Sequence, residues 1–188
     1  MTTPSSSYRH VSISLRLAER SDKPEIYQWL AQSDVTSSMM GPPDYADHPI
    51  PTWDEFDADY TEELFGPGDA SGGKCFIIEL DAEAIGVVCH SELDRQRRET
   101  ELDIWLKSQS LCGQGYGPHA LRLLMQQLHR EHHIDHFFIR PSARNTRAIA
   151  AYQKAGFQLL TQPPMRYLRP EELDYADSVV LVKEFADE

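Results

Sequence analysis

Glycine occupies every second position from 113 to 117 in the segment Cys112-Gly-Gln-Gly-Tyr-Gly-Pro-His-Ala-Leu121, which lies between a predicted strand and a predicted helix. Gly113, Gly115 and Gly117 allow positive φ angles, and without a Cβ they let a ligand approach the backbone. The helix that begins directly afterwards presents unpaired N–H groups and a partial positive charge. The segment therefore predicts a loop that binds a phosphate or pyrophosphate, although such a turn can also be only a tight connection.

The loop restricts the fold because of the elements on either side of it. The strand at 99–106 alternates, with Leu102, Ile104 and Leu106 on one face and Glu101, Asp103 and Trp105 on the other. The helix after the loop has apolar residues at the i, i+3, i+4 and i+7 positions, namely Leu121, Leu124, Met125 and Leu128. A strand at 136–140 follows. The unit from 103 to 139 therefore predicts a parallel crossover whose loop lies at a carboxyl strand end, where such folds bind ligands.

The other patterns predict an α+β fold in α/β/α layers, with one central mixed, mostly antiparallel sheet. A hairpin is predicted at 75–80 and 84–93, and further strands at 13–17, 157–160 and 179–185. Helices are predicted at 53–65, at 144–155, and from Asp22, whose spacing to Glu25 matches a capping box. The chain of 188 residues suits a single domain at 11–188 after a flexible tail at 1–10.

Charge narrows the class of partner. The chain has 18 Lys and Arg against 30 Asp and Glu, a net charge of −12. This opposes binding to nucleic acid and favours a cationic partner. Eight carboxylates and no Lys or Arg lie between Asp44 and Glu63. The segment is either a solvated helix face or a wall that attracts cations.

Other features limit the location and the use of metals. No apolar run approaches the length of a membrane span and no export signal is visible, so we expect a cytoplasmic protein without a membrane partner. The three cysteines have no CxxC spacing and are expected to be reduced thiols. His129, His132, His133 and His136 cluster, but no carboxylate or thiol completes a ligand set, so no metal site is predicted. The oligomeric state stays open between monomer and homodimer.

Two segments together resemble a known family. Gly-Gln-Gly-Tyr-Gly-Pro-His-Ala-Leu at 113–121 and Asn-Thr-Arg-Ala-Ile-Ala-Ala-Tyr-Gln-Lys-Ala-Gly-Phe at 145–157 are similar to the acetyl-CoA-binding core of the GNAT N-acetyltransferase superfamily. The resemblance implies a GNAT-like fold and acetyl-CoA as cofactor. It implies that the pyrophosphate lies on the loop and the pantetheine arm along the strand before it. The implied cofactor residues are Ile104, Trp105, Leu106, Gly113, Gln114, Gly115, Tyr116, Gly117, Pro118, Asn145 and Tyr152.

The resemblance also implies catalytic roles. Asn145 and Tyr152 are seven residues apart, so they share a helix face. Tyr152 matches the family's general acid, a phenol that can protonate the CoA thiolate. The attacking amine must lose a proton, for which Asp103 and Glu101 are the candidates. Backbone N–H groups around Trp105 and Leu106 are expected to stabilise the oxyanion.

The acceptor is less defined than the cofactor. Asp103 lies ten residues before Gly113, the spacing of an active-site aspartate in the aminoglycoside 6′-N-acetyltransferases, although Arg140 stands where that branch would have an acidic residue. A small cationic amine, aminoglycoside-like as the leading case, is expected to attack the thioester directly while bound near Trp29, Asp54, Asp57 and Asp103. Alternatives are a ribosomal-protein-type N-terminal acetyltransferase and an inactive acyl-CoA-binding module.

Overall fold

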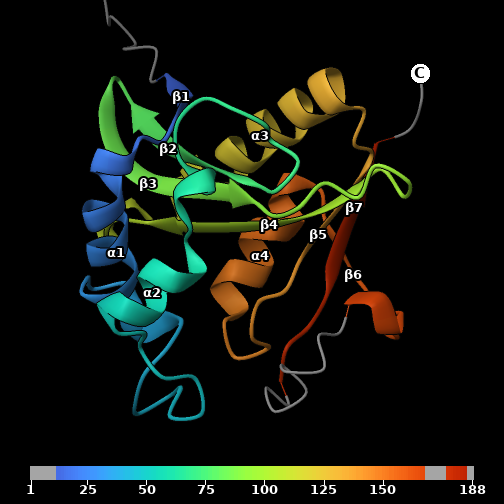
Figure 1. Ribbon diagram of the computed structural model, residues 1–188. Coiled ribbons are helices and arrows are strands. Elements are labelled where there is room, and N and C mark those ends of the chain that lie inside the picture. The colour runs from blue at the N-terminus through green and yellow to red at the C-terminus, as the bar shows by residue number, and fades with distance from the viewer. Residues whose placement is uncertain (1–11, 168–176, 186–188) are drawn as a thin grey trace, which may run out of the picture.

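A seven-stranded sheet forms the centre of the protein, with the strands in the order β1-β2-β3-β4-β5-β7-β6 (Figure 1). The computed structural model describes residues 12–167 and 177–185, so the tail predicted at 1–10 lies outside the described residues. The strands are β1 (Ile13–Leu17), β2 (Lys74–Leu80), β3 (Glu83–His90), β4 (Glu99–Leu106), β5 (His136–Ile139), β6 (Gln158–Leu159) and β7 (Leu181–Glu184). The predicted α+β fold with a mixed sheet is confirmed.

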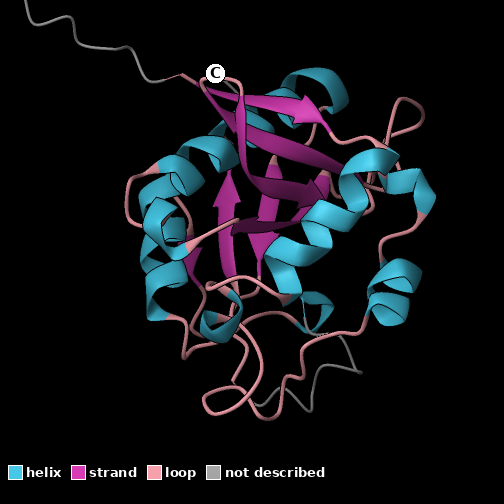
Figure 2. Ribbon diagram, turned by 90° about the vertical axis from the view of Figure 1, so that its left-hand side faces the viewer, coloured by secondary structure: helices cyan, strands magenta, loops and turns pink. Residues whose placement is uncertain are grey.

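Helices cover both faces of this sheet (Figure 2). They are α1 (Lys23–Ala31), α2 (Trp53–Asp59), α3 (Tyr116–His132) and α4 (Thr146–Ala155), and the short 3-10 helices are η1 (Arg20–Asp22), η2 (Thr36–Ser38), η3 (Glu62–Leu64), η4 (Gln109–Leu111) and η5 (Met165–Tyr167). Side chains of α3 and α4 join one core cluster, and those of α1 and α2 join the other. The sheet therefore separates a face that carries α3 and α4 from a face that carries α1 and α2.

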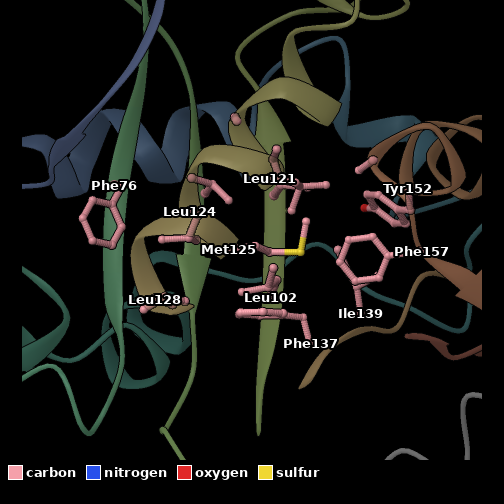
Figure 3. Close-up of a cluster of buried hydrophobic side chains, with 14 of the residues drawn as sticks. Phe76, Leu102, Leu121, Leu124, Met125, Leu128, Phe137, Ile139, Tyr152 and Phe157 are labelled. Carbon is pink, nitrogen blue, oxygen red and sulfur yellow. The ribbon is translucent and has the colours of Figure 1, made fainter. Parts of the chain in front are cut away.

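The predicted apolar stripe of α3 anchors the first of these cores. Leu121, Leu124 and Met125 are fully buried and pack with Leu102 of β4 and Phe137 of β5 (Figure 3). Burying side chains of this size contributes about 1.5–3 kcal/mol each. This packing fixes the start of α3, and hence the glycine loop, against β4.

The order of pairing changes in the middle of the sheet. Strands β1 to β4 pair with their neighbours antiparallel, which confirms the predicted hairpin and its third strand. Strands β4 and β5 are parallel, as the crossover predicted, but their pairing ends at Glu101 opposite Phe138, while β4 continues to Leu106. The two strands therefore separate over the second half of β4.

Two local predictions differ from the structure. The helix predicted at 53–65 ends at Asp59, and the chain resumes as η3 after Tyr60. The capping box predicted for Asp22 with Glu25 is wrong: Asp22 instead accepts a hydrogen bond from the Glu19 N–H at 2.7 Å and two from the Arg16 guanidinium. The Asp22 carboxylate is therefore used by an ion pair to β1, which no local spacing indicates.

Close contact between β3 and β4 gives a stability prediction. A Cβ on Gly86 would lie 2.5 Å from the Trp105 carbonyl oxygen and 2.9 Å from the Leu106 Cα. We expect Gly86→Ala to lower the free energy of unfolding by about 1–3 kcal/mol, because the two strands must move apart. Urea unfolding followed by circular dichroism measures this change.

Gly117→Ala is the matched control. Gly117 lies in the first turn of α3, and the nearest atom to an added Cβ is 3.8 Å away. Because alanine favours a helix more than glycine does, this variant should unfold at the same or a higher urea concentration than the wild type. Equal losses of stability in the two variants would contradict the strand-contact explanation.

Candidate active site

The backbone of β4 faces a gap where β5 diverges. The Ser91 N–H donates to the Glu101 carbonyl at 3.0 Å, and the Lys107 N–H donates to the Ile85 carbonyl at 2.9 Å. Since hydrogen-bonding direction alternates along an antiparallel strand, the odd-numbered residues of β4 bond to β3. The even-numbered residues face the gap. In agreement, the Ile104 N–H donates to the Asp103 Oδ1 at 2.8 Å and not to β3.

This alternation refines the expected oxyanion donors. Trp105 lies opposite Val87 in the β3–β4 register, and its N–H is directed at β3. The N–H groups of Ile104 and Leu106 are directed into the gap instead. The candidate donor to a bound carbonyl is therefore Leu106, because the strand pairing takes the N–H of Trp105 and the Asp103 carboxylate takes that of Ile104.

A cavity of about 200 Å³ runs beside this gap, between the glycine loop and α4. Among the predicted cofactor residues, all except Gln114 line it, namely Ile104, Trp105, Leu106, Gly113, Gly115, Tyr116, Gly117, Pro118, Asn145 and Tyr152. We call this space the groove cavity. The structure thus gathers residues from β4, the loop and α4 around one cavity.

The glycine loop has the backbone geometry of an anion cradle. Gly113 has φ 79° and Gly115 has φ 88°, values that side-chain-bearing residues rarely adopt. No atom lies within 4 Å of where a Cβ would stand at either position, so the loop surface is open to a ligand. Helix α3 starts at Tyr116 without a side-chain cap or an acidic residue in its first turn. Its first N–H groups can therefore bind a phosphate.

Helix α4 contributes residues that sequence analysis missed. Arg147, Ala148, Ala151 and Lys154 line the groove cavity along with Tyr152. The two alanines leave room for a ligand along the helix, and the two cations favour an anionic one. Ala151 and Lys154 stand at i+4 and i+7 from Arg147, a spacing that could have identified these three residues once the helix face was known.

A second cavity, of about 650 Å³, opens on the α1 and α2 side of β4. We call it the acceptor cavity. Its polar lining includes Tyr45, His48, Asp59, Tyr60, Glu101, Asp103, Arg140, Arg144 and Asp177. Met39, Ile104, Trp105, Asn145 and Tyr152 line both cavities. The two spaces therefore meet beside Tyr152.

Tyr152 is held as a neutral phenol at this junction. The side chain projects from α4 toward the core, and the residue is 8% exposed (Figure 3). Burial, and then the negative charge of Asp103, raises the pKa of Tyr152 well above its ordinary value. Asn145 sets the start of the same helix, since its side-chain oxygen accepts from the Ala148 N–H at 3.1 Å. Tyr152 can therefore donate a proton where the two cavities meet.

The two predicted carboxylates have different surroundings. Glu101 accepts two hydrogen bonds from Arg140, at 2.7 Å from Nε and 2.9 Å from Nη2, and both side chains are largely buried. This bidentate pair balances the charge of Glu101. Asp103 is exposed on the wall of the acceptor cavity and accepts from the Ile104 N–H. Of the two, the Asp103 carboxylate is the better placed to contact an amine.

Three predicted substrate residues do not line the acceptor cavity. Trp29 is 6% exposed and packs in the core between α1 and the sheet, because it belongs to the apolar face of α1. Asp57 pairs with the buried ammonium of Lys23 at 2.5 Å, and Asp54 lies exposed on the outside of α2. Their assignment to the substrate therefore finds no support in the cavity lining, and Asp59 is the α2 carboxylate that lines the cavity.

The acidic segment has a mixed role. Arg144 donates from Nη2 to both carboxylate oxygens of Asp47 at 2.9 Å and from Nε to Asp177 at 2.6 Å. Its guanidinium also lies over the ring of Tyr45, 4.6 Å from the centroid. These contacts tie the loop around Tyr45 to the start of α4. One part of the acidic segment therefore builds the cavity wall, whereas Asp54 and Asp57 lie outside it.

Other kinds of site find no support in the described residues. Residues 12–167 and 177–185 contain no group of three or more His, Cys, Asp or Glu side chains placed to hold a metal ion. The three cysteines are free. In the same part of the chain, no helix has the length and apolar character needed to cross a membrane.

Known proteins share this architecture. An aminoglycoside N(6′)-acetyltransferase type 1 of Klebsiella pneumoniae is 27% identical over 157 residues, 78% of this chain and 74% of the relative. The crystal structure of aminoglycoside acetyltransferase AAC(6′)-Ib with coenzyme A has a TM-score of 0.66 and 22% identity, covering 92% of this chain and 95% of that chain. RimL, a ribosomal alpha-N-protein acetyltransferase solved with coenzyme A, has a TM-score of 0.68 and 20% identity, over 93% and 94%.

The structural likenesses establish the fold, and the family follows from the sequence match. The family model described as an acetyltransferase (GNAT) domain matches residues 12–158. That range contains β4, the glycine loop, α3 and α4, which surround the groove cavity. The chain therefore belongs to the GNAT acetyltransferase domain family.

Proposed function

We propose that the protein is an acetyl-CoA-dependent N-acetyltransferase whose acceptor is a primary amine on a small cationic molecule, with an aminoglycoside-like compound as the leading case. The observation that carries the proposal is the junction of the two cavities, where Tyr152 meets a carboxylate-lined space. Family membership supports the reaction type, and the 27% identical aminoglycoside acetyltransferase supports the acceptor class. Antibiotic resistance is the role that such an acceptor would give the protein.

The residues of the groove cavity fit the cofactor. Open glycine backbone at Gly113 and Gly115, with the uncapped start of α3, suits the pyrophosphate, and Arg147 and Lys154 add positive charge. The extended backbone of β4 along the gap suits the amide and carbonyl groups of the extended arm. Acetyl-CoA supplies a thioester whose acetyl group an amine can take in one step.

The chain's own side chains supply the proton transfers. An ammonium has no lone pair, so it must lose a proton before it attacks, and Asp103 can hold the ammonium and take that proton directly or through a water. As the new C–N bond forms and the C–S bond breaks, the Tyr152 phenol gives a proton to the departing sulfur, and the second proton lost by the attacking nitrogen restores the phenol. The N–H group of Leu106, which is directed into the gap, stabilises the charge on the carbonyl oxygen.

Turnover tests this proposal. Purified protein is given acetyl-CoA with three acceptor panels, namely aminoglycosides, polyamines and peptides with free N-termini, and thiol release is followed. We expect release with small polycationic amines. Release with peptides alone would favour the protein N-terminal acetyltransferase, which the RimL likeness makes the second candidate. Binding of CoA with no release across all panels would favour the inactive module.

Removal of the Tyr152 hydroxyl should act on the chemical step. We expect Tyr152→Phe to lower kcat about a hundredfold or more, the range for a lost general acid, with little change in CoA affinity. Because the pKa of Tyr152 is raised, the wild-type phenol keeps its proton, and its ionisation should cause no fall in activity below about pH 10. Steady-state rates between neutral and alkaline pH measure both effects. A Tyr152→Phe variant with wild-type kcat would exclude the general-acid role.

Substitution of the two β4 carboxylates should separate their roles. Asp103→Asn keeps the shape but removes the proton acceptor, so kcat/KM for the amine should fall about 10²–10⁴-fold. Glu101→Gln breaks a buried ion pair with Arg140, so its main effect should be a lower melting temperature. Rates and thermal melts of both variants check this. The assignment fails if Glu101→Gln loses more of its rate than Asp103→Asn at a temperature where both are folded.

Two aspartates of α2 form a matched pair for the electrostatic contribution. Asp59 lines the acceptor cavity and Asp54 does not. We expect Asp59→Asn to raise KM for a polycationic amine about two- to fivefold at low salt, and less at high salt because exposed charges are screened. Asp54→Asn should leave KM unchanged at both salt concentrations. Equal KM values for the two variants would indicate that the carboxylates of α2 form only a solvated surface and do not attract the substrate.

The cytoplasmic location, the single domain and the oligomeric state stay predictions or open questions. The proposed reaction needs one copy of the chain, because the residues assigned to it come from β4, the glycine loop and α4 of a single chain.

A further inference from the structure

Tyr60 is a polar side chain of the acceptor cavity to which the proposed reaction gives no task. It follows α2, where its N–H donates to the Phe56 carbonyl at 2.8 Å and ends the helix. The Tyr60 ring stacks on the Phe56 ring with centroids 4.4 Å apart, and the edge-on contact with Trp105 spans 5.9 Å. Phe56 is 1% exposed. The core therefore holds the Tyr60 ring in one position on the cavity wall.

The Tyr60 hydroxyl has no hydrogen-bond partner among residues 12–167 and 177–185. A tyrosine with a largely enclosed ring usually pairs its hydroxyl, and the carboxylate of Asp103 lines the same cavity. Burial, Asp103 and the thiols of Cys89 and Cys75 raise the pKa of Tyr60 well above its ordinary value. The phenol therefore stays neutral, with a proton to donate and lone pairs to accept.

Tyr60 and Tyr152 differ in the cavities that they line. Tyr152 lines both cavities, whereas Tyr60 lines only the acceptor cavity. Asp103 lines the acceptor cavity together with both tyrosines, one from α4 and one that follows α2. A group that contacts the departing sulfur must reach the groove cavity. Tyr60 does not reach it and can contact only the acceptor.

We propose that Tyr60 is a substrate-positioning residue that accepts a hydrogen bond from the acceptor amine while Asp103 accepts another. The inference rests on the proposed function and assigns one more contact to the same site. An amine held by two acceptors loses rotational freedom, and once Asp103 takes its proton the remaining lone pair has a fixed direction. No bond to Tyr60 forms or breaks, and the Tyr60 proton stays in place.

The test is the Tyr60→Phe variant, which keeps the ring stacking and removes only the hydroxyl. We expect KM for the amine acceptor to rise about tenfold or more, as for loss of a hydrogen bond to a charged group. We also expect kcat to change less than KM, and KM for acetyl-CoA to stay at the wild-type value. A Tyr60→Leu variant removes the ring as well. A tenfold effect in Tyr60→Leu with none in Tyr60→Phe would assign the contact to the ring face and overturn the hydrogen bond.

Tyr27→Phe is the matched control. Tyr27 belongs to the same aromatic cluster, with its ring 5.3 Å from that of Phe56, but its hydroxyl donates to the Pro51 carbonyl at 3.1 Å. It lines neither cavity, so both KM values should stay at the wild-type value.

Failure of this inference and failure of the proposed function give different results. A wild type that acetylates amines, with an unchanged acceptor KM in Tyr60→Phe, would overturn the Tyr60 assignment alone. A wild type that binds CoA and acetylates no amine would overturn both. Equal rises in the KM values for acceptor and acetyl-CoA in Tyr60→Phe would also count against Tyr60, because they would indicate a general distortion of β4.

Discussion

The early end of the pairing between β4 and β5 is the constraint on which the site depends. Pairing stops at Glu101 opposite Phe138, yet β4 remains bonded to β3 as far as Leu106. The even-numbered residues of β4 therefore present backbone groups to a gap that no strand of residues 12–167 and 177–185 fills. Leu121, Leu124 and Met125 pack α3 onto one side of this gap, which places the glycine loop at its end. One irregularity in the sheet thus creates both the polar backbone edge and the space beside it.

The two carboxylates on one face of β4, Glu101 and Asp103, have different charged surroundings and therefore different roles. Glu101 is locked into a bidentate pair with Arg140, and the Arg144 guanidinium is shared between Asp47 and Asp177. Cations within the acceptor cavity are therefore balanced by fixed partners. Asp103, two residues from Glu101 on the same face, is exposed to the cavity and influences both Tyr60 and Tyr152. The strand thus provides one structural carboxylate and one that is placed to meet a ligand.

The sequence predicted the cofactor side of the site far better than the acceptor side. Gly113, Gly115 and the start of α3 follow from local rules, because positive φ angles favour glycine and a helix start is encoded within a few residues. The structure places Trp29, Asp54 and Asp57 outside the lining of the acceptor cavity, because their burial and pairing depend on how α1 and α2 pack on the sheet. Tyr60 and Asp59 were missed for the same reason, since nothing in their neighbourhood distinguishes them from the rest of an acidic helix.

The sequence by itself determined the order of elements, the parallel crossover and the anion-binding loop, because each depends on short-range periodicity or on a backbone shape that few residues adopt. Only the tertiary structure decided which carboxylate of β4 forms an ion pair with an arginine, which aspartate of α2 lines the cavity and which N–H groups face the gap. Those outcomes depend on pairs such as Arg140 with Glu101 and Arg144 with Asp47. The partners are distant in the chain and meet only after the sheet has formed, so no local pattern encodes them.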